Sequence, residues 1–237
     1  MGTWKQVAGP DDATLLKVEP EGDAIKFSFG CKQEGPCPGF VVGNYDGKRY
    51  KVADNPTWEA SFGKTGDRTI QEDGYVNGKL SRTGKWQLSP DGNTLTRTYH
   101  SDSPPGSKDI TYTADRSGGP VSKDDPFIGF WKRDWNKSDV DVLTYTRKGN
   151  VFTVTDAAGV TYERNCDGKD HPDTVVTGVL YSCRFTDPDT YDLAYKKNEK
   201  VTFSLTRKIS DDGKTMVETV KNAEGKPGPQ ETYEKIK

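Results

Sequence analysis

The sequence has little of what marks several common classes of protein. Its 237 residues include two histidines and two methionines, and 34 basic side chains nearly balance 36 acidic ones, which leaves a net charge of −2. No block of like charge stands out, so we expect no nucleic-acid partner. No apolar run approaches the roughly 20 residues that cross a bilayer. We therefore expect no membrane span.

Motifs of common enzymes and metal sites are also missing. The sequence has no G-x-S-x-G, no phosphate-binding loop and no cysteine with a nearby histidine. His100 and His171 are too scattered, and the cysteines too widely spaced, to predict a metal site. We expect no metal and no cofactor. Because catalytic groups gather in space rather than in sequence, these absences leave an enzyme open.

The four cysteines fall into two local pairs. Cys31 and Cys37 are close together, whereas Cys166 and Cys183 are 17 residues apart. Although four cysteines allow three connectivities, the spacing favours two local disulfides over free buried thiols. Disulfides indicate an oxidising compartment. The N-terminus "MGTWKQ" lacks the apolar core of a signal peptide. We expect a periplasmic or secreted protein whose signal peptide has been removed, with a cytosolic protein as the alternative.

An internal repeat is the strongest signal in the chain. "GTWK" at 2–5 returns as "GFWK" at 129–132 with an offset of 127, and "NYDGK" at 44–48 returns as "NCDGK" at 165–169 with an offset of 121. The difference, 127 − 121 = 6, places a six-residue insertion in the first copy, in the region of its cysteine pair. The two predicted disulfides are therefore not equivalent.

The repeat suggests two domains. The polar, Gly- and Pro-rich segment 115–126 has the composition of a linker. We expect a first domain at 1–118 and a second at 126–237.

The pattern inside each copy is that of short strands. Apolar residues alternate over segments such as 79–88 and 94–99, turn residues separate the segments, and no stretch has a sustained helical period. About ten strands in each copy predict an all-β chain of two tandem antiparallel meanders. A meander hides its edges by closing into a barrel, here of about 8–10 strands. One large twisted sheet or sandwich shared by both copies is the alternative.

The motifs resemble a known family. A Gly-x-Trp at the first strand ("GTW", "GFW"), later "DGKRY" and "SDDGKTMVET", and a final "TYEKIK" are similar to the calycin superfamily, and most of all to bacterial lipocalin-like domain proteins. The resemblance covers nearly the whole chain twice, but neither copy has the second lipocalin motif. It implies lipocalin or fatty-acid-binding-protein-like barrels in exported proteins that bind ligands.

The hairpin around Asp91 and Gly92 predicts cross-strand pairs. If these two residues form the turn, the numbers of each pair sum to 183, so that Leu88 faces Leu95 and Trp86 faces Arg97. The apolar face of this hairpin is expected to point inward, and it comprises Leu80, Trp86, Leu88 and Leu95. In the second copy the pairs sum to 425, which sets Arg207 opposite Glu218.

The inward face of the first copy also carries Arg82, Arg97 and Tyr99. No carboxylate stands opposite Arg97 in the hairpin, so this copy is expected to present an unmatched guanidinium inside its barrel. A buried unpaired charge is costly and commonly holds an anion. We predict that Arg82, Trp86, Arg97 and Tyr99 bind the head group of a small amphipathic acid, an arrangement that resembles fatty-acid-binding proteins.

Other interpretations of these residues remain open. Arg97 could instead pack across the indole of Trp86 or Trp4 by a cation–π contact. The favoured function is a monomeric, non-catalytic binding protein of the bacterial envelope, with a small amphipathic or anionic ligand in the first barrel. The alternative is a hydrolase, lyase or isomerase, with Arg207 and Glu218 or Arg97 and Tyr99 as its reacting groups.

Overall fold

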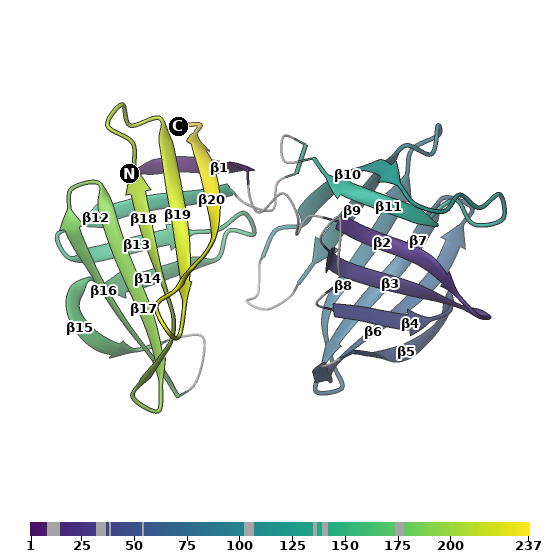
Figure 1. Cartoon of the computed structure of the whole chain (residues 1–237), viewed down its shortest axis with the longest axis horizontal. Coiled ribbons are helices and arrows are strands. Elements are labelled where there is room, and N and C mark those ends of the chain that lie inside the picture. Colours follow the sequence, from purple (N-terminus) through teal and green to yellow (C-terminus); the bar gives the residue numbers. More distant parts are fainter. Residues whose placement is uncertain are drawn as a thin grey trace. The chain divides into compact units, whose positions relative to one another are not determined.

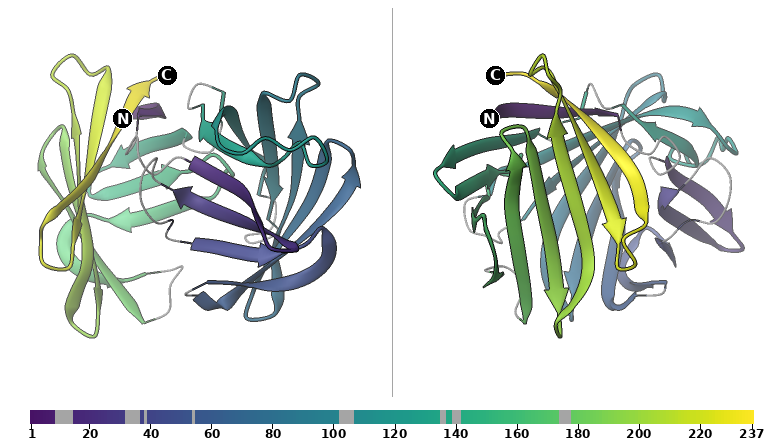
Figure 2. Two further views of the ribbon diagram at one scale, coloured as in Figure 1. Left: turned by 45° about the vertical axis from the view of Figure 1, so that its right-hand side comes forward. Right: turned by 60° about the vertical axis from the view of Figure 1, so that its left-hand side comes forward.

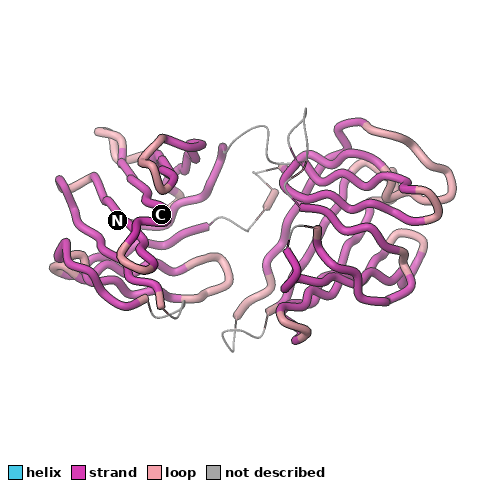
Figure 3. Tube along the Cα trace, turned by 60° about the horizontal axis from the view of Figure 1, so that its bottom comes forward, coloured by secondary structure: helices cyan, strands magenta, loops and turns pink. Residues whose placement is uncertain are grey.

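The chain consists of strands joined by turns and bends. The computed structural model describes residues 1–8, 15–31, 37, 39–53, 55–101, 107–134, 137–138, 142–173 and 178–237, without the side chains of 56 and 229. Strands dominate the trace, and the described residues contain no helix (Figure 3). Accordingly, no helix with the length and apolar character of a membrane span occurs among them.

The strands form two ten-stranded antiparallel sheets, each curled into a nearly closed barrel, which confirms the predicted fold class (Figure 1). The first barrel runs in sheet order through β4 (Gly39–Gly43), β3 (Ala24–Cys31), β2 (Leu15–Glu21), β11 (Gly129–Arg133), β10 (Ile110–Gly118), β9 (Thr94–His100), β8 (Lys79–Leu88), β7 (Thr69–Val76), β6 (Asn55–Gly66) and β5 (Asp46–Val52). The second runs through β14 (Thr161–Asn165), β13 (Val151–Thr155), β12 (Val142–Lys148), β1 (Gly2–Ala8), β20 (Pro227–Lys235), β19 (Thr215–Asn222), β18 (Lys200–Ile209), β17 (Thr190–Lys197), β16 (Val179–Asp187) and β15 (Asp167–Pro172).

The two copies exchange their first strands. β1, the Gly-x-Trp strand of the first copy, pairs with β12 and β20 of the second barrel. β11, the Gly-x-Trp strand of the second copy, pairs with β2 and β10 of the first barrel. In Figure 1 the purple β1 lies among the strands of the second barrel, and in Figure 2 the N- and C-terminal ends lie side by side. The backbone N–H of Thr3 donates to the carbonyl of Lys237 at 2.9 Å.

This exchange corrects the predicted domain boundaries. The compact units are Asp11–Val140 for the first barrel, and Met1–Pro10 together with Asp141–Lys237 for the second. The boundaries 1–118 and 126–237 differ from these units because each places a Gly-x-Trp strand with its own copy. Since "GTWK" and "GFWK" fit the same place in the meander, the repeat alone does not say which strand enters which barrel.

The segment 115–126 is not a linker between the barrels. Its first residues belong to β10, and the rest connects β10 to β11 inside the first barrel. The guanidinium of Arg116 donates to the carbonyls of Ile128 at 2.8 Å and Pro126 at 2.7 Å, and lies 4.1 Å from the centroid of the Trp131 ring. Phe127 is fully buried. This polar segment is therefore a packed connection between two strands of the first barrel.

The predicted hairpin register is confirmed in both copies. β8 and β9 pair Leu88 with Leu95 and Trp86 with Arg97, while β18 and β19 pair Arg207 with Glu218. Trp86, Leu88 and Leu95 are buried as expected, but Leu80 is 57% exposed. Leu80 lies at the start of β8, beside a register shift in the β7–β8 ladder, and so faces solvent at the end of the barrel rather than its interior.

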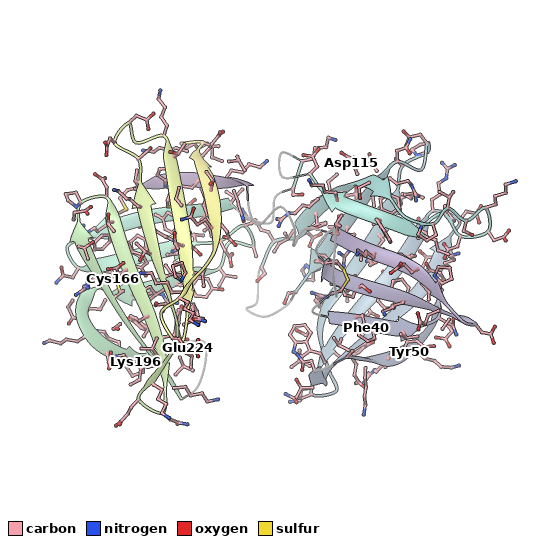
Figure 4. The ribbon with its side chains drawn as sticks, in the orientation of Figure 1. Phe40, Tyr50, Asp115, Cys166, Lys196 and Glu224 are labelled. Atoms are coloured by element: carbon pink, nitrogen blue, oxygen red, sulfur yellow. A yellow bond between two sulfur atoms is a disulfide. The ribbon has the colours of Figure 1, made fainter. Side chains whose placement is uncertain are left out.

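Both predicted disulfides are present. Cys31 is bonded to Cys37, and Cys166 to Cys183. Cys166, labelled in Figure 4, lies between β14 and β15, the two outermost strands of the second sheet. Its bond to β16 therefore holds the place where this barrel closes.

Candidate functional site

The four residues predicted to bind a ligand head group surround a carboxylate of the protein itself. Glu72 on β7 is fully buried. Its Oε2 accepts hydrogen bonds from Trp86 Nε1 at 2.6 Å, Arg97 Nη2 at 3.1 Å and Tyr99 Oη at 3.1 Å. Its Oε1 accepts one from Arg82 Nη2 at 3.0 Å. The structure thus brings the predicted residues together around Glu72, which takes the place expected for a ligand carboxylate.

The guanidinium that was expected to be unmatched is therefore paired. The prediction was wrong because it considered only the partner of β9 across the hairpin, whereas Glu72 lies one strand further away. Alternation along "TIQEDGYV" puts Ile70, Glu72 and Gly74 on one face, and Ile70 is fully buried. That alternation was the signal that could have identified Glu72.

The packing interpretation of Arg97 is supported as well. Its guanidinium carbon lies 4.4 Å from the centroid of the Trp86 ring. Burial lowers the pKa of Arg97, and the charge of Glu72 opposes this shift. Gly84 provides space for the Tyr99 ring, because a Cβ at Gly84 would lie 2.7 Å from a ring carbon. The cluster is consequently a close-packed part of the core.

Aromatic side chains pack against one another in the core of the first barrel. Phe27 and Phe62 are fully buried and stack with ring centroids 4.0 Å apart. The Trp86 ring meets both of them edge-on, at 6.0 Å from each. Interdigitated rings of this size leave the space between the strands occupied by the protein.

The second barrel carries smaller side chains at the matching positions. Val154 takes the place of Phe27 at the offset of 127, and Cys183 takes that of Phe62 at the offset of 121. The strand pairing agrees, since Phe62 faces Glu72 in the first barrel and Cys183 faces Leu193 in the second. The aromatic stack is therefore absent at these positions of the second barrel.

A cavity of about 530 Å³ lies where the aromatic volume is reduced. The residues that line it come mostly from β12, β13, β14, β16, β17 and β18, and they include Leu143, Val154, Leu193, Tyr195, Phe203 and Leu205. Phe203 is 38% exposed although its strand neighbour Leu205 is buried, which marks an opening at that end. The volume lies within the range of about 300–1,000 Å³ that is usual for small-molecule sites.

A few polar groups are fixed at one side of this large cavity. Arg164 Nη1 lies 3.3 Å from Asp173 Oδ2, and this carboxylate is only 3% exposed. A second nitrogen of Arg164 donates to the hydroxyl of Tyr195, and the guanidinium carbon lies 4.8 Å from the centroid of the Tyr181 ring. The pair is neutral as a whole. The large cavity thus combines apolar walls with a small polar patch.

A second, smaller cavity of about 30 Å³ lies in the same barrel. Arg207 lines both cavities. Its guanidinium is bonded to Glu218, as the hairpin register predicted, and lies 5.2 Å from the Tyr145 ring centroid and 5.9 Å from that of Tyr191. The paired arginine is therefore part of the wall of both cavities.

A third depression, of about 310 Å³, follows β16, β17 and β18. Small and polar side chains such as Ser182, Ala194 and Ser204 line much of it. It lacks the aromatic walls of the large cavity, and this makes it the weaker candidate for an apolar ligand.

The two histidines lie outside these cavities. His100 Nδ1 is 2.8 Å from Asp109, and His171 Nε2 is 2.8 Å from Asp167. In the first copy Tyr50 makes the equivalent contact, with its hydroxyl donating to Asp46 at 2.9 Å. Within the described ranges, no group of three His, Cys, Asp or Glu side chains is placed to hold a metal ion.

Comparisons with protein-family models, with curated proteins and with solved structures give no match to this chain.

Proposed function

We propose that the chain is a lipocalin-like binding protein whose second barrel holds a small, largely apolar or amphipathic ligand. The observation that carries this proposal is the cavity of about 530 Å³ lined by β12, β13, β14, β16, β17 and β18. Apolar walls supply affinity through the area they remove from water, and a few fixed polar groups orient the ligand. This moves the ligand from the first barrel, where Glu72 pairs with both Arg82 and Arg97, to the second.

The disulfides support an oxidising compartment for this function. Cytosolic proteins seldom keep structural disulfides, whereas exported ones commonly do. We therefore place the protein in the periplasm or outside the cell, and we propose that it acts as a monomer. All the residues that line the cavity belong to this one barrel, so no second chain is needed to form its walls.

The decisive experiment fills the cavity with the side chain that the first barrel uses. Val154→Phe restores the aromatic group found at Phe27. Fluorescence titration with N-phenyl-naphthylamine, a neutral apolar probe, is expected to show saturable uptake by the wild type and at least tenfold weaker uptake by the variant.

A matched control makes the same chemical change outside the barrel. Val151 lies on the same strand, β13, and is 36% exposed. Val151→Phe should bind the probe as the wild type does. Equal uptake by wild type and Val154→Phe, or no uptake by the wild type, would remove the proposal.

A further inference from the structure

Three buried polar atoms of the second barrel have no hydrogen-bond partner among the described residues: Trp4 Nε1, Tyr145 Oη and Tyr191 Oη. Their residues are 0%, 3% and 4% exposed, respectively. All three residues line the small cavity beside Arg207. Buried polar atoms are nearly always satisfied in folded proteins, so a group of three around one cavity indicates a missing partner.

All three atoms are hydrogen-bond donors. An indole N–H can only donate, and a neutral phenol has a proton to donate. Burial raises the pKa of Tyr145 and of Tyr191, so both hydroxyls keep their protons at neutral pH. The partner that suits the small cavity is therefore an acceptor of hydrogen bonds.

The charges around the small cavity favour a neutral acceptor over an anion. The one guanidinium on its wall, Arg207, is already bonded to Glu218, and Asp189 adds a further carboxylate to the lining. Met1 also lines the cavity, but its α-ammonium already lies near Asp189, so an incoming carboxylate would be repelled by Glu218 and Asp189 without a further cation to offset them. A carbonyl oxygen meets the three donors without that repulsion.

The position of Arg207 connects this group to the large cavity. Arg207 lines both cavities, so both adjoin its side chain, and a ligand that extends past the guanidinium would have parts in both. A volume of about 30 Å³ exceeds the 10–15 Å³ that one water needs, so a group of a few atoms fits. Trp4 belongs to the exchanged strand β1, which means that strand exchange completes the site.

We propose that the small cavity receives the carbonyl oxygen of a neutral ketone, ester or amide, held by Trp4, Tyr145 and Tyr191, while the apolar part of the same ligand occupies the large cavity. This inference rests on the proposed function of the second barrel and names the class of its ligand.

The test compares three molecules with the same number of carbons. n-Octane, methyl hexyl ketone and octanoate are each used to displace N-phenyl-naphthylamine from the intact protein. The ketone should bind most tightly, by about two- to tenfold in Kd for each hydrogen bond it gains over octane. Octanoate should bind more weakly than the ketone.

Variants of the two tyrosines locate the effect. In Tyr145→Phe and Tyr191→Phe the advantage of the ketone over octane should shrink towards unity. Tyr233→Phe is the matched control, since Tyr233 is buried, donates to Glu231 at 2.8 Å and lines neither cavity. It should keep the preference for the ketone.

The possible results separate the two proposals. Three results would overturn the carbonyl site: equal displacement by all three molecules, a preference for octanoate, or a preference for the ketone that survives both tyrosine variants. The hydroxyls would then be hydrogen-bonded to water instead. Failure of the probe to bind the wild type at all would instead remove the proposed function of the barrel.

Discussion

The two barrels share one topology and one type of buried ion pair, yet they use the pair differently. In the first barrel Arg97 is paired with Glu72 from β7, and in the second Arg207 is paired with Glu218 across a hairpin. At the offset of 121 the position of Glu72 is Leu193 in the second barrel, and that of Arg97 is Glu218. The two barrels therefore accept a buried ion pair at different inward positions, as long as both charges are buried together.

The side chains around the pair decide whether a cavity remains. The carboxylate of Glu72 is enclosed by Trp86, Tyr99 and two arginines, and phenylalanine rings fill the space beyond them. In the Arg207–Glu218 pair, by contrast, the arginine lines two cavities. The comparison indicates that the repeat provides the scaffold, and that a few inward positions decide whether it encloses a ligand site.

The largest expected effect comes from giving the first barrel the residue of the second. Glu72→Leu copies Leu193 and leaves Arg97 buried without its carboxylate. Breaking a buried ion pair costs about 3–5 kcal/mol. The free energy of unfolding of the variant, measured with urea, should therefore be lower by up to about 5 kcal/mol. Glu21→Gln, at an exposed carboxylate of the same barrel, should be neutral. A stable Glu72→Leu protein would mean that the cluster is not a central part of this core.

The strand exchange predicts that each Gly-x-Trp strand stabilises the barrel of the other copy. Trp4→Ala removes a fully buried indole and should destabilise the second barrel by about 4 kcal/mol. Hydrogen exchange should then accelerate in peptides from β12 to β20. Trp131→Ala should accelerate exchange in the first barrel instead. Faster hydrogen exchange in β2 to β9 of the Trp4→Ala variant would contradict the exchange of strands between the barrels.

The two disulfides should differ moderately in their contribution. The bond between Cys166 and Cys183 closes a separation of 17 residues, and that between Cys31 and Cys37 a separation of six. Chain entropy predicts that the free energy of unfolding falls by about 3 kcal/mol when the Cys166–Cys183 bond is removed and by about 2 kcal/mol when the Cys31–Cys37 bond is removed. Paired Cys→Ala variants, compared by urea unfolding, measure the difference. The reverse order would show that local contacts, rather than loop length, set the stabilisation.

The smallest expected effect is a dependence on pH that both copies share. The side-chain hydrogen bond from Lys48 lowers the pKa of Asp46 to about 2, and that from His171 lowers the pKa of Asp167. A lowered folded pKa stabilises the protein above the ordinary value near 4, and this contribution is lost as pH falls towards 2. Asp46→Asn and Asp167→Asn should each flatten the decrease in Tm between pH 4 and 2. An unchanged slope would rule out these turns as its source.

The fold was predictable because its signals are local. Alternation along the strands and the turns at Gly92 and Gly213 determine the hairpin registers, and both registers were confirmed. The exchange of strands was not predictable, since Trp4 and Trp131 lie in almost identical motifs that fit either barrel. The sequence therefore specified the strand positions without specifying which copy supplies each first strand.

The candidate site was predictable only in part. Arg82, Trp86, Arg97 and Tyr99 do come together, but Glu72 was missed because its contacts cross two strands rather than one hairpin. The cavity of the second barrel depends on the combined volume of side chains from several strands, such as Val154 and Cys183. Such a sum becomes visible only when the strands are placed in space.

The most direct test of the account is to locate a bound apolar molecule in the intact protein. Methyl hexyl ketone titrated into isotope-labelled protein should shift the backbone amide resonances of β12, β13, β14, β16, β17 and β18, the strands that line the large cavity. Those of β3, β6, β7, β8 and β9, which enclose Glu72 and the aromatic stack, should stay in place. Shifts confined to the first barrel would contradict the central claim that the second barrel holds the ligand site.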